Sequence, residues 1–480
     1  MKTPPAEPSS LALGEAREAA LEYAAELVLR AWREFDQARD QEPVPSAALI
    51  AALAESLPED AADVRVQLDL AAAALDTSIA QSRPRFLAYV GSSGLEIGAL
   101  ADLLAHSYDP NLAIDAGSAT RIESQTIEWL AEFVGYPADC GFFTSGGTIS
   151  NITALAAARE RALPGSRMNG VRVPLAVYCS EEVHYSVVRG AELLGIGRNA
   201  VRAVPLDGHR RMDPQALDHL IAADIATGVI PMAVVATSGT TLTGAIDPLD
   251  ALADVCEKYD VWLHVDGAYG LPAAGAPTSA PLFAGLARAH SVSVDAHKWL
   301  FVPKACSAIM VRDRQLLAAA FAHNEAYIPH VDNELNAVDV TLEYSRPLRA
   351  LKLWLAFRVH GARAFRAALE RNLAQAQLLY ELASQHPRFE VQPLPPQLSI
   401  TPIRHVVPDC SDVDAHNDAL CRALIADGRV YISPAIIDGS SWLRPCFTNF
   451  RTTDHDVRVA LETADEVGLT LCSSQHNATH

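Results

Sequence analysis

A lysine follows a short β-rich run in the stretch SVDAHKWLF, residues 293–301. Apolar residues flank Lys298 on both sides, and the imidazole of His297 precedes it directly. Because burial disfavours a cation, this position predicts a lysine with a lowered pKa that can act as a nucleophile. Asp266 likewise follows the strand-like run VWLHV, where a carboxylate is costly unless its charge is used. The simpler alternatives are a salt-bridged strand end for Lys298 and a turn cap for Asp266.

A glycine-containing loop, Ser145-Gly146-Gly147-Thr148, follows another such run, CGFFT, and leads directly into a helical pattern. Glycine lets backbone N–H groups approach an anion closely, and a helix N-terminus favours negative charge. The loop therefore predicts a phosphate site, with a plain tight turn as the alternative.

One cofactor, pyridoxal 5'-phosphate, would use all of these groups together with two more that follow predicted strands, His184 and Ala268. Its aldehyde needs an amine such as Lys298 for a Schiff base. Its ring nitrogen needs a carboxylate such as Asp266, which keeps the ring protonated as an electron sink. His184 would cover one face of the ring and Ala268 the other, while residues 145–148 would hold the phosphate.

The elements that must position these residues form an alternating pattern between about residues 85 and 310. Helix-length segments separate seven short β-rich runs: CGFFTS, LAVYCS, VRAVPL, PMAVVATSG, VWLHVDG, SVSVDA and CSAIMV. Such alternation predicts an α/β fold with a mostly parallel seven-stranded sheet and helices on both faces. Ligands bind such sheets at the carboxyl ends of the strands, where the chemical residues fall.

Three regions differ in pattern. Residues 1–84 contain helical patterns and no strand signal, which predicts an arm that packs on a partner subunit. Residues 85–384 hold the α/β pattern and end in a long helix from about residue 346. Residues 385–480 alternate short strands with helices, which predicts a smaller α+β domain.

Composition narrows the class of protein. The 480 residues carry a formal net charge of −20, which repels nucleic acid and excludes it as an expected partner. The eight cysteines are scattered without a CxxC pair, so we expect reduced thiols, a cytoplasmic location and no metal site. We expect no signal peptide and no membrane span, because neither end nor middle has the required apolar run.

An ordered set of motifs resembles the group II pyridoxal-phosphate decarboxylases, which include aromatic L-amino acid, histidine, glutamate and cysteine-sulfinate decarboxylases. The set comprises SGGTISN (145–151), VHYSVVRGAELLGIG (183–197), ATSGTTLTGAIDPL (236–249), WLHVDGAYG (262–270) and HKWL (297–300). The resemblance implies the aspartate aminotransferase fold, which is pyridoxal-phosphate fold type I, and a homodimer with active sites at the subunit interface.

The resemblance also implies roles for individual residues. Lys298 would bind the cofactor, and His297 would assist at the phosphate or the substrate. Gly146, Gly147, Thr148 and Thr241 would hold the phosphate and ring substituents. Asp266 would hold the pyridinium nitrogen, Ala268 would lie under the ring, and His184 would stack on its other face.

Two further residues match the family pattern, and the residues before the lysine depart from it. In the family a mobile loop carries a tyrosine that returns a proton to the substrate carbon, and Tyr327 stands at the matching place. Arg349 matches a family arginine near the active site, or forms a structural ion pair. The family commonly has Asn-Pro-His-Lys where this chain has Asp295-Ala296-His297-Lys298. Because a phosphate repels a carboxylate, we expect Asp295 to point away from the cofactor.

The predicted activity is decarboxylation of an L-amino acid to its amine and carbon dioxide. An aromatic or related bulky substrate ranks first, with Phe86, Tyr89 and Arg349 as candidate substrate contacts. An acidic amino acid or diaminobutyrate ranks second, because the SGGTISN loop is typical of the glutamate and cysteine-sulfinate branch and Arg121 could bind a distal acid. Further alternatives are an aldehyde synthase, a transaminase and a silent pyridoxal-phosphate carrier.

Overall fold

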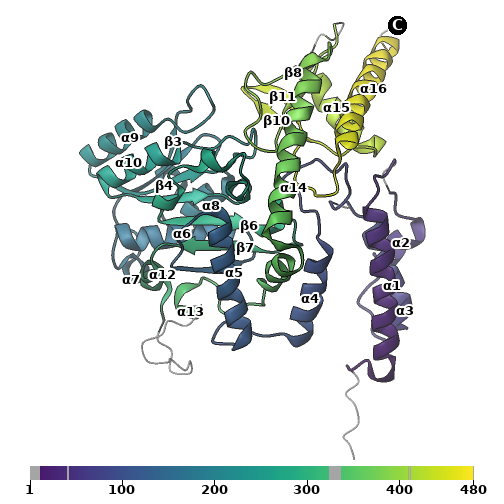
Figure 1. Ribbon diagram of the computed structural model, residues 1–480, viewed down its shortest axis with the longest axis horizontal. Helices are drawn as coiled ribbons and strands as arrows, with labels where there is room; N and C mark the ends of the chain where they lie inside the picture. Colours follow the sequence, from purple (N-terminus) through teal and green to yellow (C-terminus); the bar gives the residue numbers. More distant parts are fainter. Residues whose placement is uncertain are drawn as a thin grey trace, which may run out of the picture.

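The computed structural model describes residues 11–40, 43–79, 81–323, 337–408, 410 and 412–478. Its centre is a seven-stranded sheet built from the seven runs that the sequence predicts (Figure 1). The strands are β1 Cys140–Thr144, β2 Leu175–Ser180, β3 Val201–Val204, β4 Ile230–Thr237, β5 Trp262–Asp266, β6 Ser291–Asp295 and β7 Ser307–Val311.

The strand order is β1-β7-β6-β5-β4-β2-β3. The neighbours from β6 to β3 pair in parallel, whereas β7 runs antiparallel to both β6 and β1. Since β1 and β6 are both antiparallel to β7, β1 to β6 all point the same way. Their carboxyl ends therefore meet at one edge, and the predicted mostly parallel sheet is confirmed.

Helices cover both faces of this sheet, because its strands are buried on both sides and must be shielded from water. One face packs against α6 Gly147–Ala162, α8 Tyr185–Leu193 and α12 Arg314–Phe321. The other packs against α5 Ser118–Val134, α9 Pro214–Ala226, α10 Leu249–Tyr259 and the first part of α14 Leu351–Gln385. Three shorter or peripheral helices are α4 Glu96–Tyr108, α7 Ser166–Asn169 and α13 Ala337–Val340.

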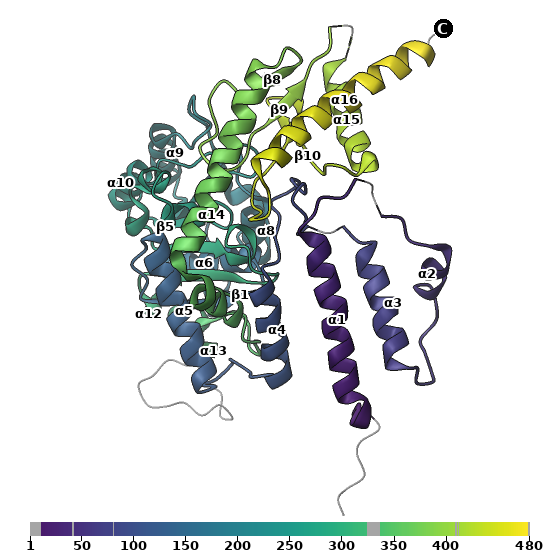
Figure 2. The same cartoon turned by 45° about the vertical axis from the view of Figure 1, so that its right-hand side comes forward.

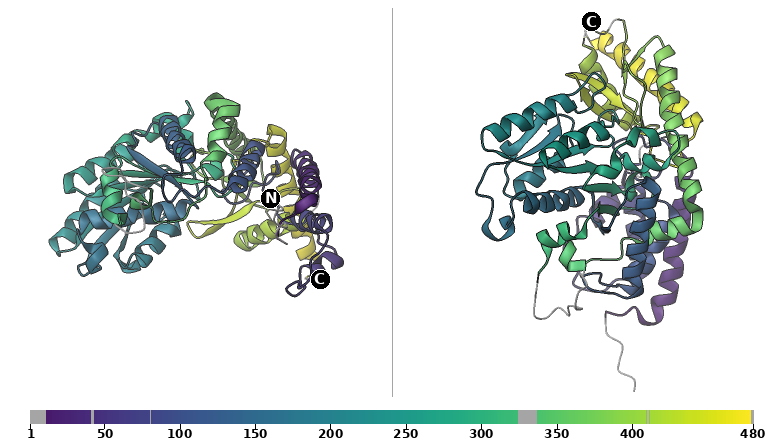
Figure 3. Two further views of the ribbon diagram at one scale, coloured as in Figure 1. Left: turned by 90° about the horizontal axis from the view of Figure 1, so that it is seen from below. Right: turned by 60° about the vertical axis from the view of Figure 1, so that its left-hand side comes forward.

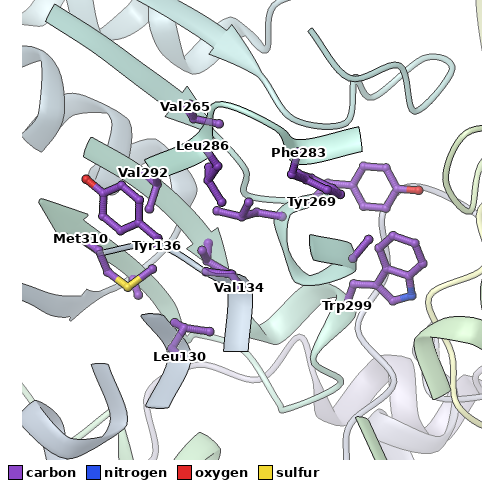
Figure 4. Packing of buried hydrophobic residues seen from close by; sticks show 14 of the residues in the cluster. Leu130, Val134, Tyr136, Val265, Tyr269, Phe283, Leu286, Val292, Trp299 and Met310 are labelled. Carbon is purple, nitrogen blue, oxygen red and sulfur yellow. The ribbon is translucent and has the colours of Figure 1, made fainter. Parts of the chain in front are cut away.

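The core behind the strand ends is apolar and closely packed (Figure 4). Val265 of β5 and Val292 of β6 point toward the same layer as Leu130 of α5, and all three are buried. Next to Lys298, Trp299 is fully buried and stacks on Tyr269 with ring centroids 5.3 Å apart. This packing fixes the backbone that carries the strand-end residues.

A second, four-stranded antiparallel sheet lies in the C-terminal region, with the order β10-β11-β9-β8. Helices α15 and α16 and the last part of α14 pack on it. Its elements are β8 Phe389–Val391, β9 Ile403–His405, α15 Val413–Asp427, β10 Ser433–Ile437, β11 Ser440–Arg444 and α16 Asp454–Ala478. Gly361, with a φ of 73°, interrupts the helical backbone of α14, which packs on both cores.

The N-terminal arm contains α1 Arg17–Phe35, α2 Ala47–Ala52 and α3 Val64–Asp76, and it stands beside the rest of the chain (Figures 2 and 3). Arg451 connects the two parts, because its Nε donates to Oδ1 of Asp36 in the arm at 3.1 Å. The division at residues 84 and 384 stays a proposal. Within the described ranges, no helix is both long enough and apolar enough to cross a membrane.

Candidate active site

A cavity of about 240 Å³ opens at the carboxyl edge of the large sheet. It brings together residues from the ends of β1, β2, β4, β5 and β6 that the sequence places up to 152 positions apart, from Gly146 to Lys298. The residues that line it are Gly146, Gly147, Thr148, Asn151, Glu182, His184, Thr237, Gly239, Thr241, Asp266, Ala268, Asp295, His297 and Lys298. A larger cavity of about 400 Å³ lies between residues 208–210 and the proline-rich segment 392–402, and its lining includes none of Lys298, Asp266 and Asp295.

Lys298 lies in the short helix α11, Ala296–Trp299, directly after β6. Its Nζ is 3.0 Å from Oδ2 of Asp295, whose side chain is only 3% exposed. Burial acts to lower the pKa of Lys298, but the carboxylate of Asp295, with a smaller contribution from Asp266, opposes it, so the pKa is raised rather than lowered as expected. The expectation that Asp295 points away is also wrong, because its carboxylate lines the cavity.

Local geometry explains both the raised pKa of Lys298 and the direction of the Asp295 side chain. Asp295 is the last residue of β6, and α11 begins at the next residue, so the chain turns Lys298 back toward the strand end. Burial opposes the charge of Asp295, but the nearby Lys298 and His297 lower its pKa below the usual range. Lys298 and Asp295 therefore form a largely buried ion pair at the end of β6.

Asp266, the last residue of β5, is held as an acceptor by two donors. The side-chain nitrogen of Asn151 donates to Oδ2 at 2.7 Å. The backbone N–H of Ala268 donates to Oδ1 at 3.1 Å, and the Ser293 hydroxyl, 3.3 Å from Oδ1, is closer to the Asn151 oxygen, to which it donates at 3.0 Å. Our sequence reasoning missed Asn151, although its place one turn after Gly147 on a helix predicts the same face.

Two histidines face the cavity in neutral form. His184 is the N-cap of α8, and its Nδ1 lies 2.8 Å from the hydroxyl of Ser186. Burial is the main cause that lowers the pKa of both His184 and His297. His297 contacts the backbone of Cys306 through Nδ1. Neither imidazole therefore adds a cation to the site at neutral pH.

The glycine loop provides the space that a phosphate needs. A methyl group on Gly146 would meet no atom within 4 Å, whereas one on Gly147 would lie 3.0 Å from Cβ of Ala268. The loop opens the N-terminus of α6, where backbone N–H groups have no partner within the helix. Thr237 adds a buried hydroxyl without a hydrogen-bond partner among the described residues. This donor set fits a phosphorylated pyridine aldehyde.

The predicted substrate contacts lie elsewhere in the single chain. Phe86 stacks on Tyr431 with ring centroids 5.0 Å apart, and Tyr89 is 55% exposed. Arg349 forms a two-pronged ion pair with Glu343, at 2.7 and 3.1 Å, as the structural alternative expected. Tyr327 lies outside the described residues.

Comparisons with known proteins agree with this chemistry. Residues 47–399 match the family model described as the pyridoxal-dependent decarboxylase conserved domain. An aromatic-L-amino-acid decarboxylase of Bacillus atrophaeus is 34% identical over 416 residues, which is 84% of this chain and 85% of the relative. A cysteine sulfinic acid decarboxylase of Rattus norvegicus is 36% identical over 277 residues, or 56% of each chain.

The fold agrees as well. The crystal structure of mouse CSAD superposes with a TM-score of 0.87 at 27% identity and covers 94% of this chain and 99% of its own. The structure of Oryza sativa TDC with PLP and tryptamine has a TM-score of 0.90 at 24% identity, covers 97% of this chain and 99% of its own, and supports the fold alone. The family match spans more than half of the chain and includes the whole cavity. The chain therefore belongs to the pyridoxal-dependent decarboxylase family, and it is an amino acid decarboxylase that uses pyridoxal phosphate.

Proposed function

We propose that this enzyme decarboxylates an aromatic or similarly bulky L-amino acid to the amine and carbon dioxide. The observation that supports this choice is the charge of the cavity. Among the described residues that line it, the one lysine or arginine is Lys298, which is proposed to bind the cofactor. Arg349 is paired with Glu343, and Arg121 lies exposed on α5, so neither is available in this chain to bind a distal acid.

The residues would divide the work as follows. Lys298 would hold the aldehyde carbon, Asp266 would face the ring nitrogen, and Gly146, Gly147 and Thr148 would bind the phosphate with Thr241 at the ring substituents. His184 and Ala268 would cover the two faces of the ring. When bound, the cofactor supplies an electron sink for the pair of electrons that carbon dioxide leaves behind.

Three residues of the chain are proposed to assist the loss of carbon dioxide and the protonation that follows. Asp266, oriented by the donors from Asn151 and Ala268, would face the ring nitrogen and accept the hydrogen bond from its N–H. His184 lies at the cavity wall with a lowered pKa and, as a neutral imidazole, orients the substrate carboxylate and the ring. Tyr327 returns a proton to the substrate carbon.

A second candidate is an acidic amino acid or diaminobutyrate. The SGGTISN loop and the similarity to cysteine sulfinic acid decarboxylases favour it. It requires a cation from outside this chain's own cavity, such as a residue of a second subunit.

We also propose that the enzyme is a cytoplasmic homodimer. The arm and α4 expose large apolar side chains that a monomer would leave in water. They include Leu21, Leu29, Val66, Leu75, Leu103, Leu104 and Tyr108. Light scattering should give twice the 51.5 kDa mass of the chain, and a single-chain mass at micromolar concentration would contradict the dimer.

A product assay tests the activity. The purified enzyme, with pyridoxal phosphate, is given a panel of aromatic, acidic, basic and aliphatic L-amino acids, and amine, carbon dioxide, aldehyde and hydrogen peroxide are followed together. We expect equal amounts of amine and carbon dioxide from an aromatic substrate, with loss of both in Lys298→Ala. Lys304→Ala, which removes a nearby lysine outside the cavity lining, is the matched control.

Other results would overturn parts of the proposal. Turnover of acidic substrates or diaminobutyrate alone would establish the second candidate. Aldehyde with peroxide from the wild type would establish an aldehyde synthase, and Tyr327→Phe would then change neither product. A bound cofactor without carbon dioxide from any substrate would exclude decarboxylation, and transfer of the amino group to a keto acid would identify a transaminase.

A further inference from the structure

Asn151 lies at the centre of a buried hydrogen-bond network beside the cavity, and its residue is 1% exposed. Its side-chain nitrogen donates to Oδ2 of Asp266 at 2.7 Å and to the hydroxyl of Ser186 at 2.9 Å. Its side-chain oxygen lies 3.0 Å from both Nε2 of His264 and the hydroxyl of Ser293. An amide has two N–H donors and two acceptor lone pairs, so these four contacts use its full capacity.

The direction of the hydrogen bonds along this network follows from the groups at its two ends, the indole of Trp262 and the carboxylate of Asp266. Trp262 has only a donor, and it donates to the hydroxyl of Ser291 at 2.9 Å. The Asn151 oxygen that faces Nε2 of His264 only accepts, so a neutral His264 carries its proton on Nε2 and Ser291 directs its own hydrogen to Nδ1, 2.8 Å away. His264 is neutral at pH 7, because burial lowers its pKa to about 4, so its proton is on Nε2 and is donated to Asn151.

Beyond Asn151, the hydrogen-bond network continues to the cavity. Because the carboxylate of Asp266 only accepts, the amide nitrogen of Asn151 must face it and cannot be exchanged with the oxygen. The hydroxyl of Ser186 accepts from Asn151, so its own hydrogen is left for Nδ1 of His184. The backbone N–H of Ser186 also points at this Nδ1. Neutral His184 therefore carries its proton on Nε2.

We propose that Asn151 is a positioning residue that joins the ring-nitrogen carboxylate, Asp266, to the ring-facing histidine, His184. It holds Asp266 as an oriented acceptor, and through Ser186 it sets which nitrogen of His184 bears the proton. This inference rests on the proposed function only in the roles given to Asp266 and His184. Asn151 itself touches neither reacting atom in this account and acts through its two neighbours.

The two arms of the network predict different defects. Asn151→Ala removes the donors to both Asp266 and Ser186, whereas Ser186→Ala removes only the donor to His184. Loss of that donor exposes Nδ1 to protonation, so the acidic limb of the pH–rate profile moves to higher pH. The charged groups that also face His184 are Asp266 and Asp295, which favour its protonation, and Lys298, which opposes it.

The test uses the full-length enzyme with three readouts: the affinity for pyridoxal phosphate, the ¹⁵N chemical shift of the bound cofactor's labelled ring nitrogen, and the pH profile of kcat/KM. Asn151→Ala should weaken affinity at least tenfold and lower the pH at which the ring nitrogen loses its proton. Ser186→Ala should leave both unchanged and raise the acidic limb by half a pH unit or more, and Ser186→Thr should restore it. Thr153→Val, which removes a buried hydroxyl bonded only to its own helix, is the control.

The outcomes separate this inference from the proposed function. If Asp266→Asn changes the ring-nitrogen signal and Asn151→Ala does not, the positioning role is wrong and the function stands. If Asp266→Asn leaves that signal unchanged, the role proposed for Asp266 fails instead. An acidic limb that does not move in a folded Ser186→Ala enzyme overturns the assignment of the His184 proton.

Discussion

Replacing Asp295 with asparagine should lower the pKa of Lys298, because it removes the charge that raises this pKa. The two side chains are 3.0 Å apart, and Asp295 is buried. Two unit charges at that distance attract by about 5 kcal/mol at an effective dielectric constant of about 20. The lysine side chain is 23% exposed, and water screens part of this attraction. A typical effect of one close opposite charge is about 1–3 pKa units, or roughly 1.4–4 kcal/mol.

The measurement is the rate at which pyridoxal, which lacks the phosphate, becomes attached to the cofactor-free enzyme between neutral and alkaline pH. Only the neutral amine attacks the aldehyde, so below both pKa values each unit of decrease raises the rate about tenfold. Asp295→Asn should therefore react about 10 to 1,000 times faster than the wild type at a fixed pH in this range. A larger gain with pyridoxal phosphate than with pyridoxal would measure repulsion between Asp295 and the phosphate.

Glu182→Gln is the matched control, because it removes a carboxylate from the same cavity whose partner is Arg210 rather than the lysine. We expect its rate profile to follow the wild type. If Asp295→Asn also follows the wild type, Asp295 does not determine the charge of Lys298, and the electrostatic reasoning is refuted.

Three further predictions concern stability and the shape of the site. Glu123→Gln should lower the free energy of unfolding, measured in urea, by about 3–5 kcal/mol, because it leaves the charge of the buried Arg346 unpaired. Arg288→Met, at an exposed cluster of ion pairs, should lower it by less than about 1 kcal/mol. Equal effects of the two substitutions would show that burial does not determine the contribution of an ion pair. His264 stays neutral in the folded state down to a pKa of about 4, while the unfolded chain takes up its proton near pH 6.5, so stability falls on acidification through that window. By pH 5 the loss from this residue is about 2 kcal/mol, and an unfolding free energy with the same pH dependence in His264→Gln would contradict it. Gly146→Ala should leave the free energy of unfolding within about 0.5 kcal/mol of the wild type, because the added methyl group meets no protein atom. The same substitution should weaken the binding of pyridoxal phosphate by about 1–3 kcal/mol, because the methyl group would occupy the space proposed for the phosphate. An unchanged affinity would place the phosphate elsewhere.

The amino-acid sequence was enough to predict the seven strands of the large sheet and the residues at their carboxyl ends. Short apolar runs between helix-length segments predicted the sheet, and polar residues directly after those runs predicted the site. Lys298, Asp266, His184, Ala268 and residues 146–148 all line one cavity. This worked because strands that run the same way bring their ends to one edge, whatever loops connect them.

Which of these groups are in contact depends on the three-dimensional packing and could not be predicted from the sequence. Asn151 and Asp266 are 115 positions apart, and they meet because α6 packs across the sheet behind β5 and β6. The turn from β6 into α11 brings Lys298 to Asp295, which reverses the expected pKa of the lysine. Arg349 is likewise taken by Glu343 rather than left for a substrate. Residue types at strand ends reveal the chemistry available, whereas hydrogen bonds and charges depend on ångström-scale distances that strand order, register and helix packing determine.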